Sequence, residues 1–531
     1  MRCVIKLLHR ILPYVILMLS YVVSVLIRIV ITRFASYYML GDENLVYHVA
    51  TLPITEFFTT LKYEPHPPLF YFFVRILSKI SNSLIIQRII LMAISYTTIF
   101  LITLFLDRKG ILKKYNLYGG LSIFFSSFLF IRIMGEIKQD SLSFPISFIV
   151  MGFILYVTDK YLIGIKNKNI VWDIPRNKFV WIFSVLVFLN VILFFIGYIP
   201  YLYVFIFSSL FLLSTRKHKY LIVFFVIQAS IILGYLSFIG LEQFIINTHR
   251  FSWATTLPNS LFLGIDRFIG VSKPYGDLKD ILKLVPFVFI TAFILKKNKK
   301  HYEKITLYLF ILLTILGYLL HLWVRPRYMI PTYLLLSIIV AWGIQSVFTI
   351  KKYAQYILIV YVFLLFVFSS LVYARDYDHA IKYIIDDVNM QFRFVNNNLY
   401  TENKSKPVGI VIAYNIRQLY NKLLFPNDYE QFIPVFIFNP DIKYPNIDMS
   451  EVLRYAIYRK LSKKDAECSL YKSGYSNFML EIPTEGHSVS RLILLDVLAR
   501  NCDPIFSEST PTIGLFQNCK FNMESCEPKN Y

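Results

Sequence analysis

Apolar runs long enough to cross a membrane recur through the first 374 residues of this chain. A helix needs roughly 20 apolar residues to span about 30 Å of hydrocarbon, and a soluble core has no use for so many runs of that length. Hydrophobic residues make up 56% of the 531 residues, whereas charged residues make up only 17%. The sequence therefore predicts a polytopic α-helical membrane protein.

About eleven of these runs are predicted to be transmembrane helices. The first follows basic residues and exceeds the length of a signal peptide core, and no small-residue cleavage site follows it. We therefore expect an uncleaved first span. The predicted spans are, in order, 11–33, 84–106, 117–134, 141–158, 179–196, 199–214, 220–241, 281–295, 305–323, 329–349 and 353–374.

The short apolar run 67–80 decides on which side of the membrane each loop lies. Its 14 residues reach only ~21 Å as a helix, so we interpret it as a juxtamembrane or re-entrant helix. The N-terminus and the basic tufts 107–114, 160–178, 216–219 and 296–304 then lie in the cytoplasm, in accord with the positive-inside rule. The net charge of +22 is carried largely by such tufts, which argues against a nucleic-acid partner.

The tail, residues 375–531, changes to a mixed polar composition that predicts a small α/β domain beside the transmembrane domain 1–374. The predicted topology places this tail outside the cell membrane. Its strands and helices are expected, in order, at 408–413, 432–438, 450–462 and 491–500. Four cysteines fall in the tail, which allows two disulfides in three pairings and fits an oxidising compartment. They are Cys468, Cys502, Cys519 and Cys526.

Polar residues able to do chemistry lie in segments that share the predicted outer face. Carboxylates at a membrane mouth are costly unless they are paired or used. Two guanidinium groups held beside a proline can grip a phosphate in bidentate fashion. The long segment 242–280 is either a lid or a tether. The candidate residues are Asp42, Glu43, His66, Glu136, Lys138, Asp140, Arg325 and Arg327.

Each candidate also has a purely structural interpretation. Asp42 could cap a helix through 45–50, Glu136 and Asp140 could hold a turn, and arginines can snorkel at the interface. A lone histidine such as His66 is usually structural. Together, however, these groups suit attack by an acceptor hydroxyl, deprotonated by a carboxylate, on a sugar carbon whose leaving group is a phosphate. The position at the membrane favours a donor with a lipid tail.

This arrangement resembles the GT-C superfamily of polyprenyl-phosphate-sugar-dependent glycosyltransferases, above all its protein mannosyltransferase and aminoarabinose transferase branch. A small α/β domain after the last span also occurs in such proteins. The likeness covers the layout of residues 1–375. The motifs that carry it are, in order, Asp42-Glu43, His66-Pro67-Pro68-Leu69, Glu136 to Asp140, and Arg325-Pro-Arg327-Tyr328-Met-Ile-Pro331.

The resemblance implies an inverting transfer from a dolichyl- or undecaprenyl-phosphate sugar to a glycan, lipid or protein. Asp42 would be the acceptor-activating base or its partner, Glu43 would support it, and the two could contact a divalent metal ion. Glu136 or Asp140 would be the second acidic group of the site. The residues expected to bind substrate are His66, Lys138, Arg325 and Arg327.

Two other classes of protein share some of these features. A transporter or channel would need ionisable residues in the middle of its spans, and often matching repeats. The spans hold few such residues, and Arg28 and Arg88 lie near span ends. A non-catalytic membrane scaffold, whose outer domain binds a partner, leaves the grouped outer residues unexplained.

Overall fold

The chain divides into two compact units in the computed structural model. The first, which we call the helical unit, contains Met1–Ile31 and Pro65–Asp376, and the second, the sheet unit, contains Thr32–Glu64 and Tyr377–Tyr531. The residues that the structure describes are 2–33, 46, 49–51, 53–61, 67–81, 84–134, 138–166, 169–240, 303, 306–313, 330–348, 352–375, 408–412, 432–436, 467–468, 470–471, 476–481, 489–506 and 513–521.

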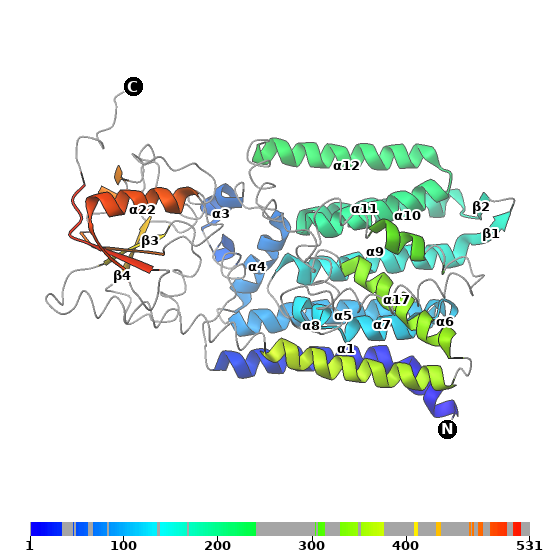
Figure 1. The fold of residues 1–531 in the computed structure, drawn as a ribbon. Helices are drawn as coiled ribbons and strands as arrows, with labels where there is room; N and C mark the ends of the chain where they lie inside the picture. Colours follow the sequence, from blue (N-terminus) through cyan, green and yellow to red (C-terminus); the bar gives the residue numbers. More distant parts are fainter. Residues whose placement is uncertain are drawn as a thin grey trace. The chain divides into compact units, whose positions relative to one another are not determined.

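Seven helices of the described residues are long and apolar enough to cross a membrane, which confirms a polytopic helical membrane protein. Figure 1 shows them alongside one another in the helical unit. They are α1 (Arg2–Arg33), α5 (Leu84–Arg108), α9 (Gln139–Tyr161), α10 (Arg176–Ile196), α12 (His218–Ile239), α17 (Ile330–Val347) and the helix Lys352–Arg375.

Helix α11 (Tyr198–Ser214) is apolar but shorter, at 17 residues, and it matches the predicted span 199–214. The predicted span 281–295 and most of 305–323 lie outside the described residues. The total of about eleven spans therefore stays a prediction.

The predicted short helix is present as α4 (Pro68–Ile80), which has 13 residues. Proline suits the first turn of a helix because its φ is already helical and its missing N–H has no partner to lose. One face of α4 is buried, and the helix contacts α5 and α10. The buried residues are Phe70, Tyr71, Val74 and Leu77.

The third predicted span is broken. It forms α7 (Leu117–Phe125) and α8 (Phe128–Met134), which meet at a bend of 63°. At the break, Ser127 turns its hydroxyl back onto a carbonyl of α7, 2.7 Å away. The Ser20 hydroxyl of α1 donates to the Phe125 carbonyl at 2.9 Å. A broken helix inside a membrane protein needs such partners for its freed backbone groups, and here side chains supply them.

Helix α7 packs against α17 at a very short distance. A Cβ atom added to Gly120 would lie 2.8 Å from the backbone Cα of Ile338. Such a contact requires glycine, as at many helix interfaces in membranes. Helix α9 contributes to two hydrophobic cores, one shared with α5, α7, α8 and α17 and the other with α10, α11 and α12. It is thus central to the helical unit.

The sheet unit contains a five-stranded sheet in the order β4-β3-β5-β7-β6. Strand β3 pairs in parallel with β4 and β5, whereas β7 pairs antiparallel with β5 and β6. Both predicted strands are present, and the predicted helix 491–500 lies in α22 (Val489–Asn501). The predicted helix 450–462 lies outside the described residues. The strands are β3 (Val408–Ile412), β4 (Phe432–Phe436), β5 (Phe478–Glu481), β6 (Asp503–Phe506) and β7 (Ile513–Gln517).

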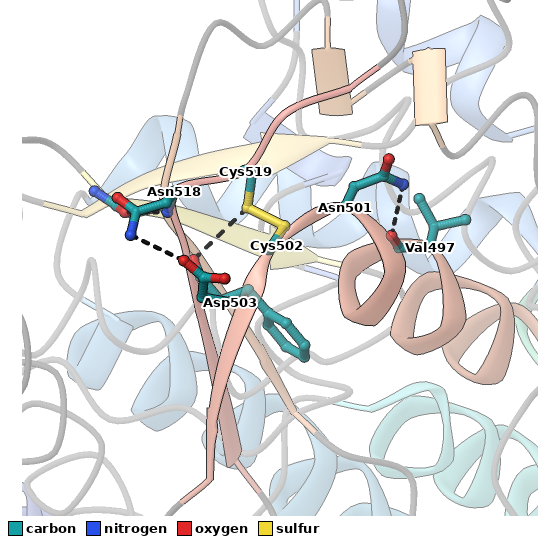
Figure 2. Close-up of a disulfide and its surroundings, with 8 residues drawn as sticks. Val497, Asn501, Cys502, Asp503, Asn518 and Cys519 are labelled. Carbon is teal, nitrogen blue, oxygen red and sulfur yellow. Dashed lines mark hydrogen bonds between the residues drawn. A yellow bond between two sulfur atoms is a disulfide. The ribbon is translucent and has the colours of Figure 1, made fainter.

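A disulfide joins Cys502, at the end of α22, to Cys519, just after β7 (Figure 2). Beside it, the Asn518 side chain donates to the Asp503 carboxylate at 3.1 Å. Cys468 is disulfide-bonded as well. The bond between Cys502 and Cys519 belongs to one of the three pairings that the sequence allows.

Candidate functional site

Charged residues of four helices meet at one end of the helical unit, which we call the basic end. Arg10 of α1 forms an ion pair of 3.2 Å with Asp107 of α5. The Tyr118 hydroxyl of α7 donates to the same carboxylate. Lys114 of α6 (Ile111–Lys114) forms an ion pair with Asp159 near the end of α9. These contacts tie the N-terminal helix to the predicted tuft 107–114.

The next two tufts lie at the same end. The segment 160–178, interpreted from the sequence as a basic loop, contains the antiparallel hairpin β1 (Leu162–Lys166) and β2 (Asn169–Trp172). The Trp172 indole N–H donates to the Ser214 carbonyl at the end of α11, 3.0 Å away. Figure 1 shows the hairpin at the same end of the helical unit as α6. The three described tufts thus share one end of the helical unit, as expected if they lie on the same side of the membrane.

The opposite end, which we call the outer end, holds two of the eight candidate residues. Helix α9 starts directly after Lys138, whose backbone is extended (φ −138°, ψ 158°). Asp140 lies in the first turn and is only 2% exposed. The Ser141 hydroxyl donates to the Lys138 carbonyl at 2.7 Å, which fixes the chain at the helix start. A carboxylate in a first turn also interacts favourably with the helix dipole.

The other six candidates lie outside the described residues, so their roles stay predictions. They are Asp42, Glu43, His66, Glu136, Arg325 and Arg327.

Neighbouring helices enclose the start of α9. The Ser95 hydroxyl of α5 donates to the Ser141 carbonyl at 2.6 Å. On another side, a Cβ added to Gly197, between α10 and α11, would lie 3.3 Å from the Ser143 Cβ. Ser95, Ser141 and Ser143 are each fully buried. The result is a hydroxyl-rich environment around the first turns of a helix that is otherwise apolar.

Arg88 of α5, which is not among the eight candidate residues, is only 2% exposed. It lies seven residues before Ser95, which is two helical turns, and so shares the face of α5 that contacts α9. A buried guanidinium within a membrane is costly and points to use or to pairing. The signal was in the sequence, since Arg88 is the only charged residue between 84 and 106. We therefore add Arg88 to the polar residues of the outer end.

The outer end brings together a buried carboxylate, a cation and several hydroxyl groups. A carboxylate so placed can accept a proton from a hydroxyl, and Lys138 at the helix start can attract an anion. Among the described residues, no group of three His, Cys, Asp or Glu side chains could hold a metal ion. Asp42 and Glu43 lie outside those residues, so the predicted metal contact stays a prediction.

Comparisons with known proteins do not extend this picture. No family model matches the chain, and no match is found among curated proteins or among solved structures.

Proposed function

We propose that this chain is a membrane glycosyltransferase that moves a sugar from a polyprenyl phosphate to an acceptor on the extracytoplasmic face. The observation that carries the proposal is the burial of Asp140, 2% exposed, in the first turn of α9 at the outer end. A carboxylate in that position is costly in a membrane unless it is paired or used. Lys138 directly precedes α9 and lies two residues before Asp140. A cation at this position suits a reaction with an anionic leaving group.

In the proposed reaction a carboxylate accepts the proton of an acceptor hydroxyl while the hydroxyl oxygen attacks the anomeric carbon of the donor. The bond from that carbon to the phosphate oxygen breaks, and the polyprenyl phosphate leaves with the electron pair. Attack from the side opposite the phosphate inverts the anomeric centre. A phosphate leaves without protonation, so one base and cationic partners for the phosphate are sufficient.

The candidate residues can be assigned to these tasks. Asp140, Glu136 or Asp42 would supply the base, with Glu43 as its support. His66, Arg325 and Arg327 would join Lys138 in holding the donor. The predicted topology supports this assignment because it brings all eight residues to one side of the membrane.

The disulfide between Cys502 and Cys519 supports the orientation. Disulfides persist in oxidising compartments and are rare in the cytosol. An odd number of spans, as predicted, puts the two termini on opposite sides of the membrane. If the tail is outside, the N-terminus is in the cytoplasm, and so is the basic end, which includes Arg10 of the N-terminal helix. We therefore propose that the N-terminus is cytoplasmic and that the outer end faces the extracytoplasmic space.

A transporter is the second candidate, and the break between α7 and α8 is the observation that favours it. Transporters often use discontinuous helices to build a substrate site near the middle of the membrane. The break here is closed by serine hydroxyls, which donate at 2.7 and 2.9 Å to the Phe124 and Phe125 carbonyls, so these carbonyl groups have partners within the bundle without a solute. We therefore rank the transferase first.

The test is a transfer assay with the purified full-length protein in lipid vesicles. Extracted polyprenyl-phosphate sugars serve as donors, and mass spectrometry detects a sugar added to glycan, lipid or protein acceptors. We expect transfer by the natural chain and its loss in Asp140→Asn. Full activity in Asp42→Asn, Glu43→Gln and Asp140→Asn alike would refute the site, and solute flux without any transfer would favour the transporter.

A further inference from the structure

Two parallel helices begin side by side at the basic end. The Phe179 ring of α10 and the Tyr220 ring of α12 are 4.8 Å apart, and Phe183 lies 5.2 Å from the same tyrosine. Lys217, directly before α12, holds its ammonium 4.0 Å from the centre of the Phe179 ring. These contacts fix the first turns of α10 and α12 as one surface.

Cations dominate this surface, which we call the α10–α12 patch. Arg176 and Lys178 open α10, and Lys217 and Lys219 lie at the start of α12. Neither helix has an acidic residue in its first turn. The pKa of Lys217 is lowered, first by burial and then by repulsion from the nearby Arg176 charge.

The carboxylates that the structure describes at this end do not neutralise the patch. Asp107 and Asp159 form ion pairs with Arg10 and Lys114. Asp173, three residues before Arg176, is exposed and forms no ion pair with a described residue. Positive charge at a helix start is also unfavourable for the helix dipole, so helix stability does not explain the patch. An external anion would relieve the repulsion.

Exposed large apolar side chains follow further along the same two helices, on faces turned away from the contact between Phe179 and Tyr220. On α10, Trp181 is 58% exposed, and on α12, Ile222 is 62% exposed. Both helices are candidate membrane spans, so these side chains face acyl chains. Tryptophan is typical of the headgroup level of a membrane. Cations at the helix starts with exposed apolar side chains one turn further match a molecule with an anionic head and a lipid tail.

We propose that the α10–α12 patch binds the headgroup of an anionic phospholipid, whose acyl chains lie along the outward faces of α10 and α12. Arg176 and Lys217 hold the lipid phosphate, and the lipid removes the repulsion between them. This site is at the basic end and does not depend on the proposed transferase activity.

Native mass spectrometry of the full-length protein in detergent tests the proposal, with phosphatidylglycerol and phosphatidylcholine as the two lipids. We expect retained phosphatidylglycerol and little phosphatidylcholine. Arg176→Gln with Lys217→Gln should weaken phosphatidylglycerol binding on the order of 25-fold, since each cation near an anionic lipid surface is worth roughly fivefold. An excess of inorganic phosphate should not displace the lipid, because the acyl chains contribute to binding.

Two further variants keep the test decisive. Lys6→Gln with Lys113→Gln removes two exposed cations at the same end but outside the patch, and it should bind as the natural chain does. Arg176→Lys with Lys217→Arg preserves the charges and should also keep the lipid. Equal binding of both lipids, or equal losses in the patch variant and in the Lys6 and Lys113 control, would overturn the proposal. Displacement by inorganic phosphate would instead show a site for the free anion.

Discussion

The two ends of the helical unit treat charge in opposite ways. At the basic end, Arg10 is largely exposed and meets Asp107 in an ion pair whose carboxylate is also bonded by Tyr118. At the outer end, Asp140 is 2% exposed in the first turn of α9, where Ser141 and Ser143 are also buried. Both ends belong to the same helices, so the difference in how charged residues are placed does not come from a difference in secondary structure.

The contrast separates groups that hold the helices together from groups that are candidates for chemistry. Exposed or half-exposed ion pairs contribute little to stability and tolerate change. A buried carboxylate within a membrane protein is expensive to keep and is a functional candidate by default. Variants at the two ends should therefore affect different measurements.

The largest effect is expected from Asp140→Asn. Transfer should fall at least ~100-fold, because a positioned proton acceptor contributes about 10²–10⁴-fold. Initial rates measured by mass spectrometry in vesicles check this. Asp107→Asn, a similar change at the basic end, is the matched control and should stay within about twofold of the natural rate. If Asp140→Asn kept more than half of the activity, the proposed role of Asp140 as the proton acceptor would be refuted.

Gly120→Ala should cause the next largest effect, on stability. The added methyl group would lie 2.8 Å from the Ile338 backbone, so α7 and α17 would have to separate. We expect the free energy of unfolding to fall by about 1–3 kcal/mol, the usual range for overpacking. Thermal unfolding in detergent measures it. Gly234→Ala, where no atom lies within 4 Å of the added carbon, should be neutral or slightly stabilising.

Asp107→Ala should lower the free energy of unfolding by about 1.5 kcal/mol, since it removes a hydrogen bond to a charged group and an ion pair whose arginine is largely exposed. A double-mutant cycle with Tyr118→Phe would isolate the part contributed by the tyrosine. If Asp107→Ala abolished transfer in a folded protein, the basic end would also belong to the site, and the comparison between the ends would fail.

The smallest effect is expected between the ends, where the Asn190 side chain of α10 donates to the Ser208 hydroxyl of α11 at 3.0 Å. Hydrogen bonds between membrane helices average about 0.6 kcal/mol. Asn190→Leu should therefore change the unfolding free energy by about that amount and leave transfer unchanged. A loss of more than about 2 kcal/mol would mean that buried polar groups in this bundle are structural, which would weaken the case for Asp140 as well.

Much of the fold could be predicted because hydrophobic length is a strong signal. The positions of the described spans, the short helix α4 and the strands β3 and β4 all follow from local pattern. The break at Ser127 could not be predicted, because serine is tolerated in an apolar run and because Ser20, whose hydroxyl donates to the Phe125 carbonyl, comes from a distant helix. The hairpin was missed because its strands of five and four residues carry lysine and asparagine.

The candidate site was predictable only in part. Asp140 and Lys138 stand out as polar residues at a span boundary, and the structure adds that Asp140 is buried. The burial of Arg88 depends on which helices pack against α5, and hydropathy along the chain contains no such information. The hydroxyl groups from Ser95 and Ser143 likewise reach the start of α9 only through packing.

The order of strands in the sheet unit has a consequence for biosynthesis. Strand β7, the last described strand along the chain, lies inside the sheet between β5 and β6. A ribosome makes the chain from the N-terminus, so β5 and β6 must wait for β7 before either gains that neighbour. The disulfide closes only once Cys519 has also been made. A messenger RNA that ends before the codons of β7 would yield a chain whose spans can insert but whose sheet lacks an inner strand. Quality-control proteases would be expected to remove such a product.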